Sequence, residues 1–122
     1  MKATELVGCG FSPGQASGAG GTYSALAATG SSQATGATTV ASMSIVSAAD
    51  GTKAVTLQGQ AGDEIWLFNN SASTLKVYPD SGSAIAVTAT GLGTANASFD
   101  HATYKNGLYK KVSSTQWFVI LY

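Results

Sequence analysis

Short runs of alternating apolar and polar residues dominate the chain from residue 41 to residue 122. Successive side chains of a β-strand point to opposite faces of a sheet, so a period of two indicates a strand buried on one side. The runs recur about every 8–12 residues, which is typical of small all-β domains. Together with two runs that are apolar on both faces, 64–68 and 116–121, the strand candidates cover residues 42–46, 53–57, 74–78, 84–87, 95–99 and 107–112.

Turn-forming residues separate these runs. Gly adopts positive φ, Pro fixes φ, and Asn or Asp can bond to the nearby backbone. Asn106-Gly107 is the strongest signal for a two-residue hairpin turn, and no long helical period competes with the strands. We therefore predict an all-β fold, a compact antiparallel β-sandwich or barrel-like domain over residues 41–122.

Residues 1–40 are rich in small side chains, since Gly, Ala, Ser and Thr fill 25 of the 33 positions from residue 8 on. No charged residue occurs between Glu5 and Asp50. Such a segment buries too little apolar surface to offset about 1–2 kcal/mol of backbone entropy per residue. A flexible tail, an arm ordered on a partner, and loop-rich strands packed on the rest of the chain are the alternatives. We favour an extended N-terminal arm over residues 1–40, anchored by Phe11 and Tyr23.

Two of the predicted strands, residues 64–68 and 116–121, are apolar on both faces. One face of each strand can meet the internal core of a small domain. The other face needs the arm, a second sheet or another subunit to cover it. The aromatic and aliphatic residues expected at an interface are therefore Trp66, Phe68, Phe118, Ile120 and Tyr122, together with Phe11 and Tyr23 of the arm.

Composition narrows the function classes. Six Lys balance six Asp and Glu, and the chain has no Arg, so a basic nucleic-acid surface is not expected. No apolar run approaches the roughly 20 residues of a membrane-spanning helix. One Cys and one His make no internal disulfide and no ordinary zinc site. Charged residues are 10% of the chain, against about 25% in ordinary domains, which fits either a surface covered by partners or a neutral monomer with a Ser/Thr-rich surface.

Catalytic motifs are weak. Asp100 and His101 are adjacent, and adjacent strand side chains point to opposite faces, so they are not expected to act as a pair. The same argument applies to Asp63 and Glu64. The Gly-rich stretch at residues 18–21 lacks the Lys and Ser/Thr of a phosphate-binding loop. We expect no enzyme activity, no cofactor and no bound metal.

Three segments carry a resemblance to a known class of proteins. They are Gly62-Asp63-Glu64-Ile65-Trp66-Leu67-Phe68-Asn69-Asn70, then Leu75-Lys76-Val77-Tyr78-Pro79-Asp80-Ser81-Gly82 with Ile85, then Ser113-Ser114-Thr115-Gln116-Trp117. In order and spacing, about residues 50–121 resemble a β-rich module of small virion structural proteins of tailed bacteriophages. That resemblance implies a head decoration protein or a fibre or tail-associated module, commonly trimeric, with no catalytic residues.

These inferences combine into one expected function. We expect a capsid decoration, or cement, protein that is made in the host cytoplasm and lies on the capsid surface of the virion. As a homotrimer it would bind across neighbouring copies of the major capsid protein. The alternative is a trimeric fibre or tail-associated module that binds a glycan or protein on the host surface. A small hydrolase built around His101 is a third hypothesis.

Overall fold

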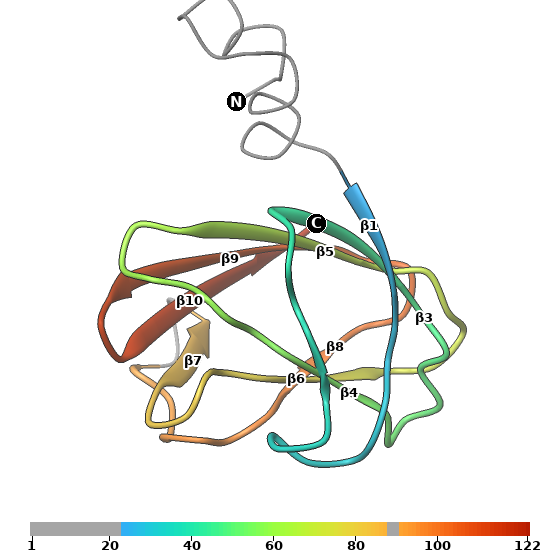
Figure 1. Cartoon of the computed structure of the whole chain (residues 1–122), viewed down its shortest axis with the longest axis horizontal. Helices are drawn as coiled ribbons and strands as arrows, with labels where there is room; N and C mark the ends of the chain where they lie inside the picture. The colour runs from blue at the N-terminus through green and yellow to red at the C-terminus, as the bar shows by residue number, and fades with distance from the viewer. Residues whose placement is uncertain (1–22, 88–90) are drawn as a thin grey trace, which may run out of the picture.

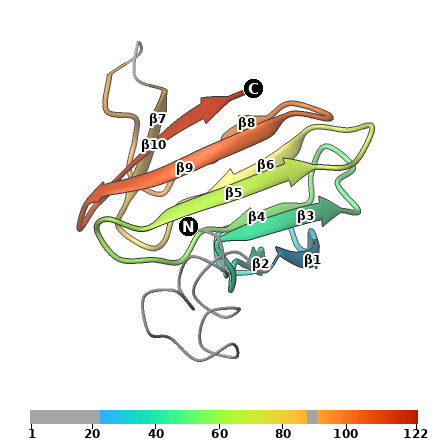
Figure 2. The same cartoon turned by 90° about the horizontal axis from the view of Figure 1, so that it is seen from above.

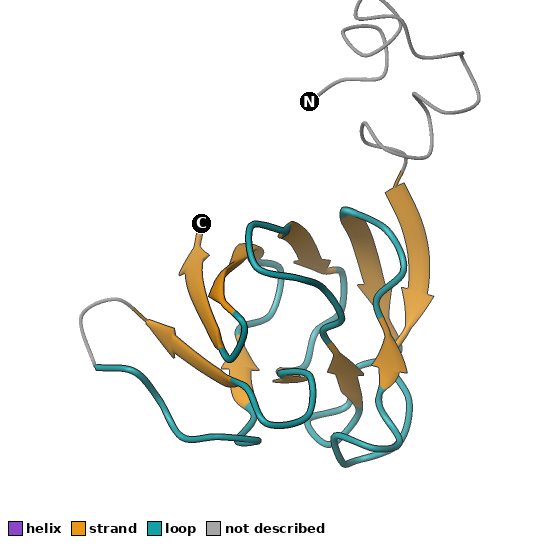
Figure 3. Cartoon of the chain, turned by 60° about the vertical axis from the view of Figure 1, so that its left-hand side comes forward, coloured by secondary structure: helices purple, strands orange, loops and turns teal. Residues whose placement is uncertain are grey.

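The computed structural model describes residues 23–87 and 91–122, which form ten β-strands and no helix (Figures 1 and 3). The strands are β1 (Tyr23–Ala27), β2 (Ala37–Thr38), β3 (Met43–Ser47), β4 (Ala54–Thr56), β5 (Glu64–Asn69), β6 (Leu75–Tyr78), β7 (Ala84–Val87), β8 (Phe99–His101), β9 (Asn106–Ser113) and β10 (Gln116–Leu121). The predicted all-β class is confirmed.

The strands belong to two sheets, and the chain moves from one sheet to the other with nearly every strand (Figure 2). The six-stranded sheet has the order β1-β3-β5-β9-β10-β7, and the four-stranded sheet has the order β2-β4-β6-β8. From β1 to β6 the path is a winding in which each turn contributes one strand to each sheet. The hairpin of β9 and β10 then lies between β5 and β7.

The predicted antiparallel pairing is wrong for most of the fold. Five of the eight strand pairs are parallel, namely β1–β3, β3–β5, β2–β4, β4–β6 and β10–β7. In the winding from β1 to β6 each turn repeats the direction of the one before it, so the four pairs formed between successive turns are parallel. The fifth parallel pair, β10 with β7, lies outside this winding. A period of two marks a strand but carries no information about the direction of its partner.

The hairpin turn predicted at Asn106-Gly107 is also wrong, because both residues lie at the start of β9. A Cβ on Gly107 would stand 2.7 Å from Cε1 of the buried His101 ring and 3.0 Å from the Tyr109 ring. Close packing against His101 therefore requires glycine here. Ser114 and Thr115 instead form the turn between β9 and β10.

Residues 23–40, which the sequence assigns to the arm, supply β1 and β2. The Ala28 side chain is buried in the core, and Leu26 packs against it. Thr29 exchanges two backbone hydrogen bonds with Ala54, 3.0 and 3.1 Å long. The ordered domain thus extends N-terminal to the predicted boundary at residue 40, because sheets built by later strands provide hydrogen-bonding edges for a segment with few large side chains. Phe11 lies outside the described residues.

The core lies between the two sheets. Both contribute fully buried side chains to it, and the largest of these is Trp117 from β10. The core side chains are Ala28, Val46, Val55, Leu57, Ile65, Leu67, Leu75, Val77, Ile85, Tyr109, Trp117 and Val119. Each sheet therefore turns one face to the core. At β4 the opposite face is covered as well, because Ala54 and Thr56 are buried and the Thr56 hydroxyl donates to the Gln33 carbonyl.

Candidate functional site: the outer face of the six-stranded sheet

Strand β5 shows how the outer face of this sheet is built. Ile65 and Leu67 are buried in the core, whereas Trp66 and Phe68 point to the opposite face and are half-buried. In a strand with large apolar residues on both faces, one alternate set of side chains therefore packs in the core, and the other set lies on the outer side of the sheet.

Strand β10 repeats this arrangement two places away in the sheet. Trp117 and Val119 are buried, while Phe118 and Ile120 lie on the outer face, and 48% of Ile120 is exposed. Tyr122 follows the strand and is 62% exposed. Its ring lies 5.8 Å from the Trp66 ring, centroid to centroid.

Strand register joins these residues into a continuous apolar row. Met43 pairs with Trp66, Trp66 with Leu108, and Leu108 with Ile120, so the row crosses β3, β5, β9 and β10. Side chains opposite one another in neighbouring strands lie about 4.5–5.5 Å apart. Ile45 and Phe68 form a second paired set beside the row. We call these residues, with Phe118 and Tyr122, the outer face.

The outer face is hollowed between β3 and β5. The hollow has a volume of ≈ 360 Å³ and is lined by Met43, Ser44, Ile45, Trp66, Phe68 and Asn106. Its lining contains no charged residue. A hollow of this chemistry suits an apolar or aromatic side chain rather than an ion.

Charge is nearly absent from the outer face. Glu64 and Lys110 lie opposite each other in register, and their Nζ and Oε1 atoms are 3.4 Å apart. Lys111 is the remaining charged residue in the six strands that the structure describes for this sheet, and it is buried. The outer face therefore carries no net charge.

The four-stranded sheet has a polar outer surface. Lys76 and Asp100 form an ion pair of 2.6 Å across β6 and β8. The Tyr78 hydroxyl donates to the Ser31 carbonyl, and the Gln33 side chain donates to the Pro79 carbonyl. Residues 31–33 thus lie over part of this surface, and its exposed part carries polar and charged side chains, unlike the apolar outer face of the six-stranded sheet.

The structure brings five of the seven proposed interface residues onto one face: Trp66, Phe68, Phe118, Ile120 and Tyr122. Tyr23 begins β1, at the edge of the same sheet, where it pairs with Met43. Sequence reasoning missed Met43, Ile45 and Leu108. Their alternation was visible, but the outward direction of each side chain became clear only from the register.

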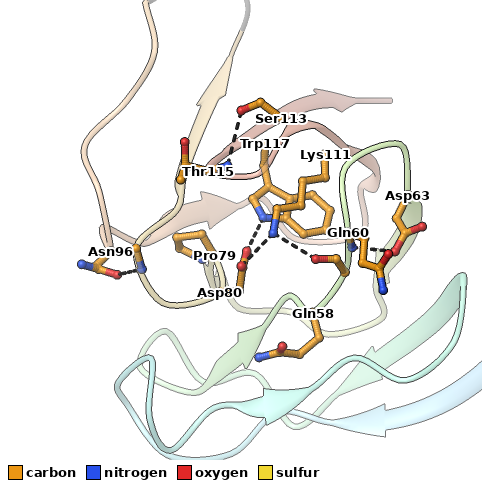
Figure 4. Close-up of polar contacts among 12 residues, drawn as sticks. Gln58, Gln60, Asp63, Pro79, Asp80, Asn96, Lys111, Ser113, Thr115 and Trp117 are labelled. Atoms are coloured by element: carbon orange, nitrogen blue, oxygen red, sulfur yellow. Dashed lines mark hydrogen bonds and ion pairs between the residues drawn. The ribbon is translucent and has the colours of Figure 1, made fainter.

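A buried polar cluster links the ends of several strands and loops (Figure 4). The Trp117 indole N–H donates to Oδ1 of Asp80 at 2.7 Å, and Lys111 Nζ donates to Oδ2 of Asp80 at 2.7 Å. Lys111 also donates to the Gly59 carbonyl at 2.9 Å, and its Nζ lies 5.5 Å from the centre of the Trp117 ring. Both carboxylate oxygens of Asp80 are thus engaged by the protein.

Burial opposes ionisation of Asp80, but the hydrogen bonds from Lys111 and Trp117 outweigh it and hold the pKa of this carboxyl below its ordinary value of 3.8. The Lys111 side chain is 5% exposed and that of Asp80 is 20% exposed. The cluster therefore contains an ionised and largely buried pair. Its groups are used to hold loops together, which is a structural role.

The same cluster brings together the three sequence segments singled out above. The Gly62 N–H donates to the Lys111 carbonyl, and the Lys111 N–H donates to the Asp63 carbonyl. The Ala84 N–H donates to the Thr115 carbonyl at 2.9 Å. The turns at residues 60–63 and 79–82 and the β9–β10 hairpin therefore meet around Asp80.

His101 belongs to a second buried cluster, and it is completely inaccessible. Its Nε2 atom lies 2.7 Å from the Lys105 carbonyl oxygen, so Nε2 must donate. In the neutral ring Nδ1 then accepts from the Tyr109 hydroxyl, also at 2.7 Å. The neighbouring Asp100 points outward and pairs with Lys76. The geometry thus separates Asp100 from His101, and neither ring nitrogen is available to a substrate.

The buried His101 is expected to make stability fall in mild acid. Burial lowers the pKa of His101 below 6.5, although the Lys105 carbonyl acts in the opposite direction. The unfolded chain therefore binds a proton near pH 6.5 that the folded chain resists, and the free energy of unfolding should decrease as pH falls from 7 to 5. Urea unfolding at several pH values should show this slope. A His101→Gln variant should lack it, whatever its stability at pH 7, and an equal slope in both proteins would contradict the assignment.

Within residues 23–87 and 91–122, no group of three or more His, Cys, Asp or Glu residues is arranged to hold a metal ion. In that part of the chain there is also no helix with the length and apolar character needed to cross a membrane. Comparisons of the chain with protein families, with curated proteins and with solved structures found no match.

Proposed function

We propose that this chain is a non-enzymatic structural protein of a bacteriophage virion, namely a capsid decoration protein. It forms homotrimers that bind across neighbouring copies of the major capsid protein and stabilise the head. The observation that carries this proposal is the outer face of the six-stranded sheet, which is largely apolar, has no net charge and is continuous over four strands. The resemblance of residues 50–121 to phage virion modules is the reason for proposing that the particle is a phage virion.

Assembly follows from the chemistry of the outer face. Contiguous apolar surface on a soluble protein marks a place where another molecule binds. Trp66, Phe68, Phe118 and Tyr122 are aromatic residues of the kind that contribute most to binding energy. A formal net charge of zero gives copies of the chain no long-range repulsion. Sister copies are therefore suitable occupants of this face.

The hydrogen bonding of the buried polar side chains also agrees with a structural role. The buried Asp80, Lys111 and His101 are all bonded to other groups of the protein. A decoration protein needs no active site, because it acts by adding interface. A standard protein interface buries roughly 1,600 Å², and three linked contacts on one particle can gain about 10²–10⁴ in avidity.

Residues 1–22 complete the proposal as an N-terminal arm, shortened from the predicted 1–40. This segment is neutral, with Lys2 and Glu5 as its charged residues, and Phe11 is its one aromatic residue. A neutral arm can lie against a capsid subunit without the cost of removing charges from water. Phe11 is its proposed anchor.

Cryo-electron microscopy of purified virions tests this function. The proposal predicts density for three copies of the domain around threefold or quasi-threefold positions of the head. The heads of particles that lack the protein should break open at lower temperature, or in lower salt, than the heads of particles that carry it. Density confined to the tail, with bare heads, would contradict the decoration role.

The Trp66–Tyr122 ring pair favours one other function, a fibre or tail-associated module that binds a host glycan or protein. An exposed Tyr122 beside an indole is the kind of surface on which a sugar ring can stack. Glycan-array binding that disappears in Tyr122→Ala, with tail-located density, would select this alternative. Absence of binding to glycans and to host cells would remove it.

A further inference from the structure

We infer that β1 is not the outer strand of the six-stranded sheet: residues 3–7 form a further strand that pairs in parallel with β1, one turn earlier in the winding. These residues lie outside the described ranges, and the free edge of β1 together with the sequence before it carries the inference. The additional strand does not depend on the decoration role. The proposed N-terminal arm is then folded back on the domain at its start.

The winding is open at its N-terminal end. In the described part of the chain, β1 and β2 each have one hydrogen-bonded neighbour, β3 and β4, and Figure 2 shows both strands at the same end of the domain. A strand with a free side presents unpaired backbone N–H and C=O groups, on which another strand can pair. The first strands of the two sheets therefore offer a place for one more turn.

The core is incomplete at this end. Leu26 of β1 packs against the core but is only half-buried, whereas its register partner Val46 of β3 is fully buried. The two side chains occupy equivalent positions, but β3 has a strand on each side and β1 has a strand on one side. Ala37 of β2 is partly buried in the same way. A strand outside β1 with an apolar inward side chain would cover Leu26 and remove its exposed surface from water.

The sequence before β1 supplies such a side chain at the expected spacing. Val46 lies 20 residues after its register partner Leu26, and Leu6 lies 20 residues before Leu26. Gly30 follows β1 with a φ of 58°, a conformation that favours glycine, and Gly10 lies 20 residues before Gly30. An inward apolar residue and the glycine after it thus recur together at one spacing, as expected for a repeated turn.

The alternation of side chains agrees with this register. With Leu6 turned to the core, Glu5 and Val7 point outward, because successive side chains of a strand lie on opposite faces. Their register positions on β1 are Ala25 and Ala27, and both of these residues are exposed. The Glu5 carboxylate therefore stays in water, and forming the strand requires no burial of charge.

The positions of the charged residues also favour a strand outside β1. Edge strands that face water usually carry charged side chains, which prevent pairing with other chains. β1 has no charged residue, and the nearest ones before it are Glu5 and Lys2. The charged residues thus lie on and beside the inferred strand rather than on β1.

The inferred turn also gives Phe11 a place on the domain. By the same step of 20 residues, Phe11 corresponds to Ser31, an exposed residue whose carbonyl accepts a hydrogen bond from the Tyr78 hydroxyl. Phe11 would be held in a loop close to the sheets. Binding a partner through Phe11 would then require the ordering of fewer residues than binding through a free arm.

Hydrogen exchange of the β1 amides tests the inference. In the full-length chain the N–H groups of residues 24–27 that point away from β3 should be protected, and deletion of residues 2–7 should speed their exchange at least about tenfold. Leu6→Ser should have a similar effect, because the inference places Leu6 in the core. Val7→Ser is the matched control: Val7 points outward, so exchange at β1 should be nearly unchanged.

A disulfide experiment tests the register. In a Cys9→Ser background, Glu5→Cys combined with Ala25→Cys should form a disulfide under mild oxidation, because register partners lie within the Cα separation of roughly 4.4–6.8 Å that a disulfide allows. Val7→Cys with Ala25→Cys is two residues out of register and should react at least about tenfold more slowly. These pairs need no truncation, so they decide the question if the deletion variant does not fold.

The outcomes separate this inference from the proposed function. Three results would each overturn the additional strand: equal exchange at β1 in the full chain and the deletion variant, equal effects of the two serine variants, or equal disulfide rates for the two cysteine pairs. Each would leave residues 1–22 as a free arm. The decoration role would still stand or fall on cryo-electron microscopy of virions.

Discussion

Replacement of Asp80 with Ala is expected to lower the free energy of unfolding by about 3–5 kcal/mol, the usual effect of removing one partner from a buried ion pair. The Lys111 ammonium would then be buried with the Gly59 carbonyl as its remaining partner, and the Trp117 indole N–H would have lost its acceptor. Urea denaturation monitored by fluorescence measures the change.

The double variant Asp80→Ala with Lys111→Met is the control. It removes the unpaired charge as well, so it should be more stable than Asp80→Ala alone. The low pKa of Asp80 adds a pH test: the pair's contribution is present above pH 3.8 and decreases as the pH falls through the lowered pKa. A loss below about 1 kcal/mol in Asp80→Ala would show that the cluster does not hold the loops together.

Leu67→Ala should cost about 2–5 kcal/mol of stability, because it removes a fully buried side chain from the core of β5. Met43→Ala, on the outer face of the neighbouring strand, should cost about 1 kcal/mol or less when measured on the dissociated chain. The pair tests which face of the six-stranded sheet is internal. Equal losses at both positions would mean that the outer face is part of the protomer's own core.

The positions of the strands could be read from the sequence. Seven of the eight predicted runs coincide closely with strands β3 to β7, β9 and β10, because each is a short run with apolar side chains that is bounded by turn-forming residues. The eighth, residues 95–99, meets β8 only at Phe99. The apolar side chains before Phe99 in this run are alanines, and alanine is a weak indicator of which face of a strand is buried.

Strand direction and the role of residues 23–40 could not be read from the sequence. Parallel pairing depends on the crossing between sheets, and alternation is the same for both directions. β1 and β2 carry few large side chains, and they are held by edges that other strands create. Gly107 wrongly suggested a hairpin turn, because a glycine is needed at this position for close packing against His101.

The candidate site was predictable in part. Strands with apolar residues on both faces pointed to Trp66, Phe68, Phe118 and Ile120, and the structure places these side chains together on one face. The hollow could not be foreseen, because it depends on the register that sets Met43 beside Trp66. The bonds of Asp80 to Trp117 and Lys111 join residues 37 and 31 positions apart, which no local pattern reports.

Acrylamide quenching of Trp66 fluorescence tests most directly whether sister copies cover the outer face. The chain has two tryptophans, and Trp117 is fully buried in the protomer. The difference between wild type and a Trp66→Phe variant therefore isolates the signal of Trp66. Trp66 should be shielded at concentrations where the chain is trimeric and should become quenchable on dilution. Free quenching at every concentration, or shielding that persists unchanged in a monomer, would contradict coverage by sister copies.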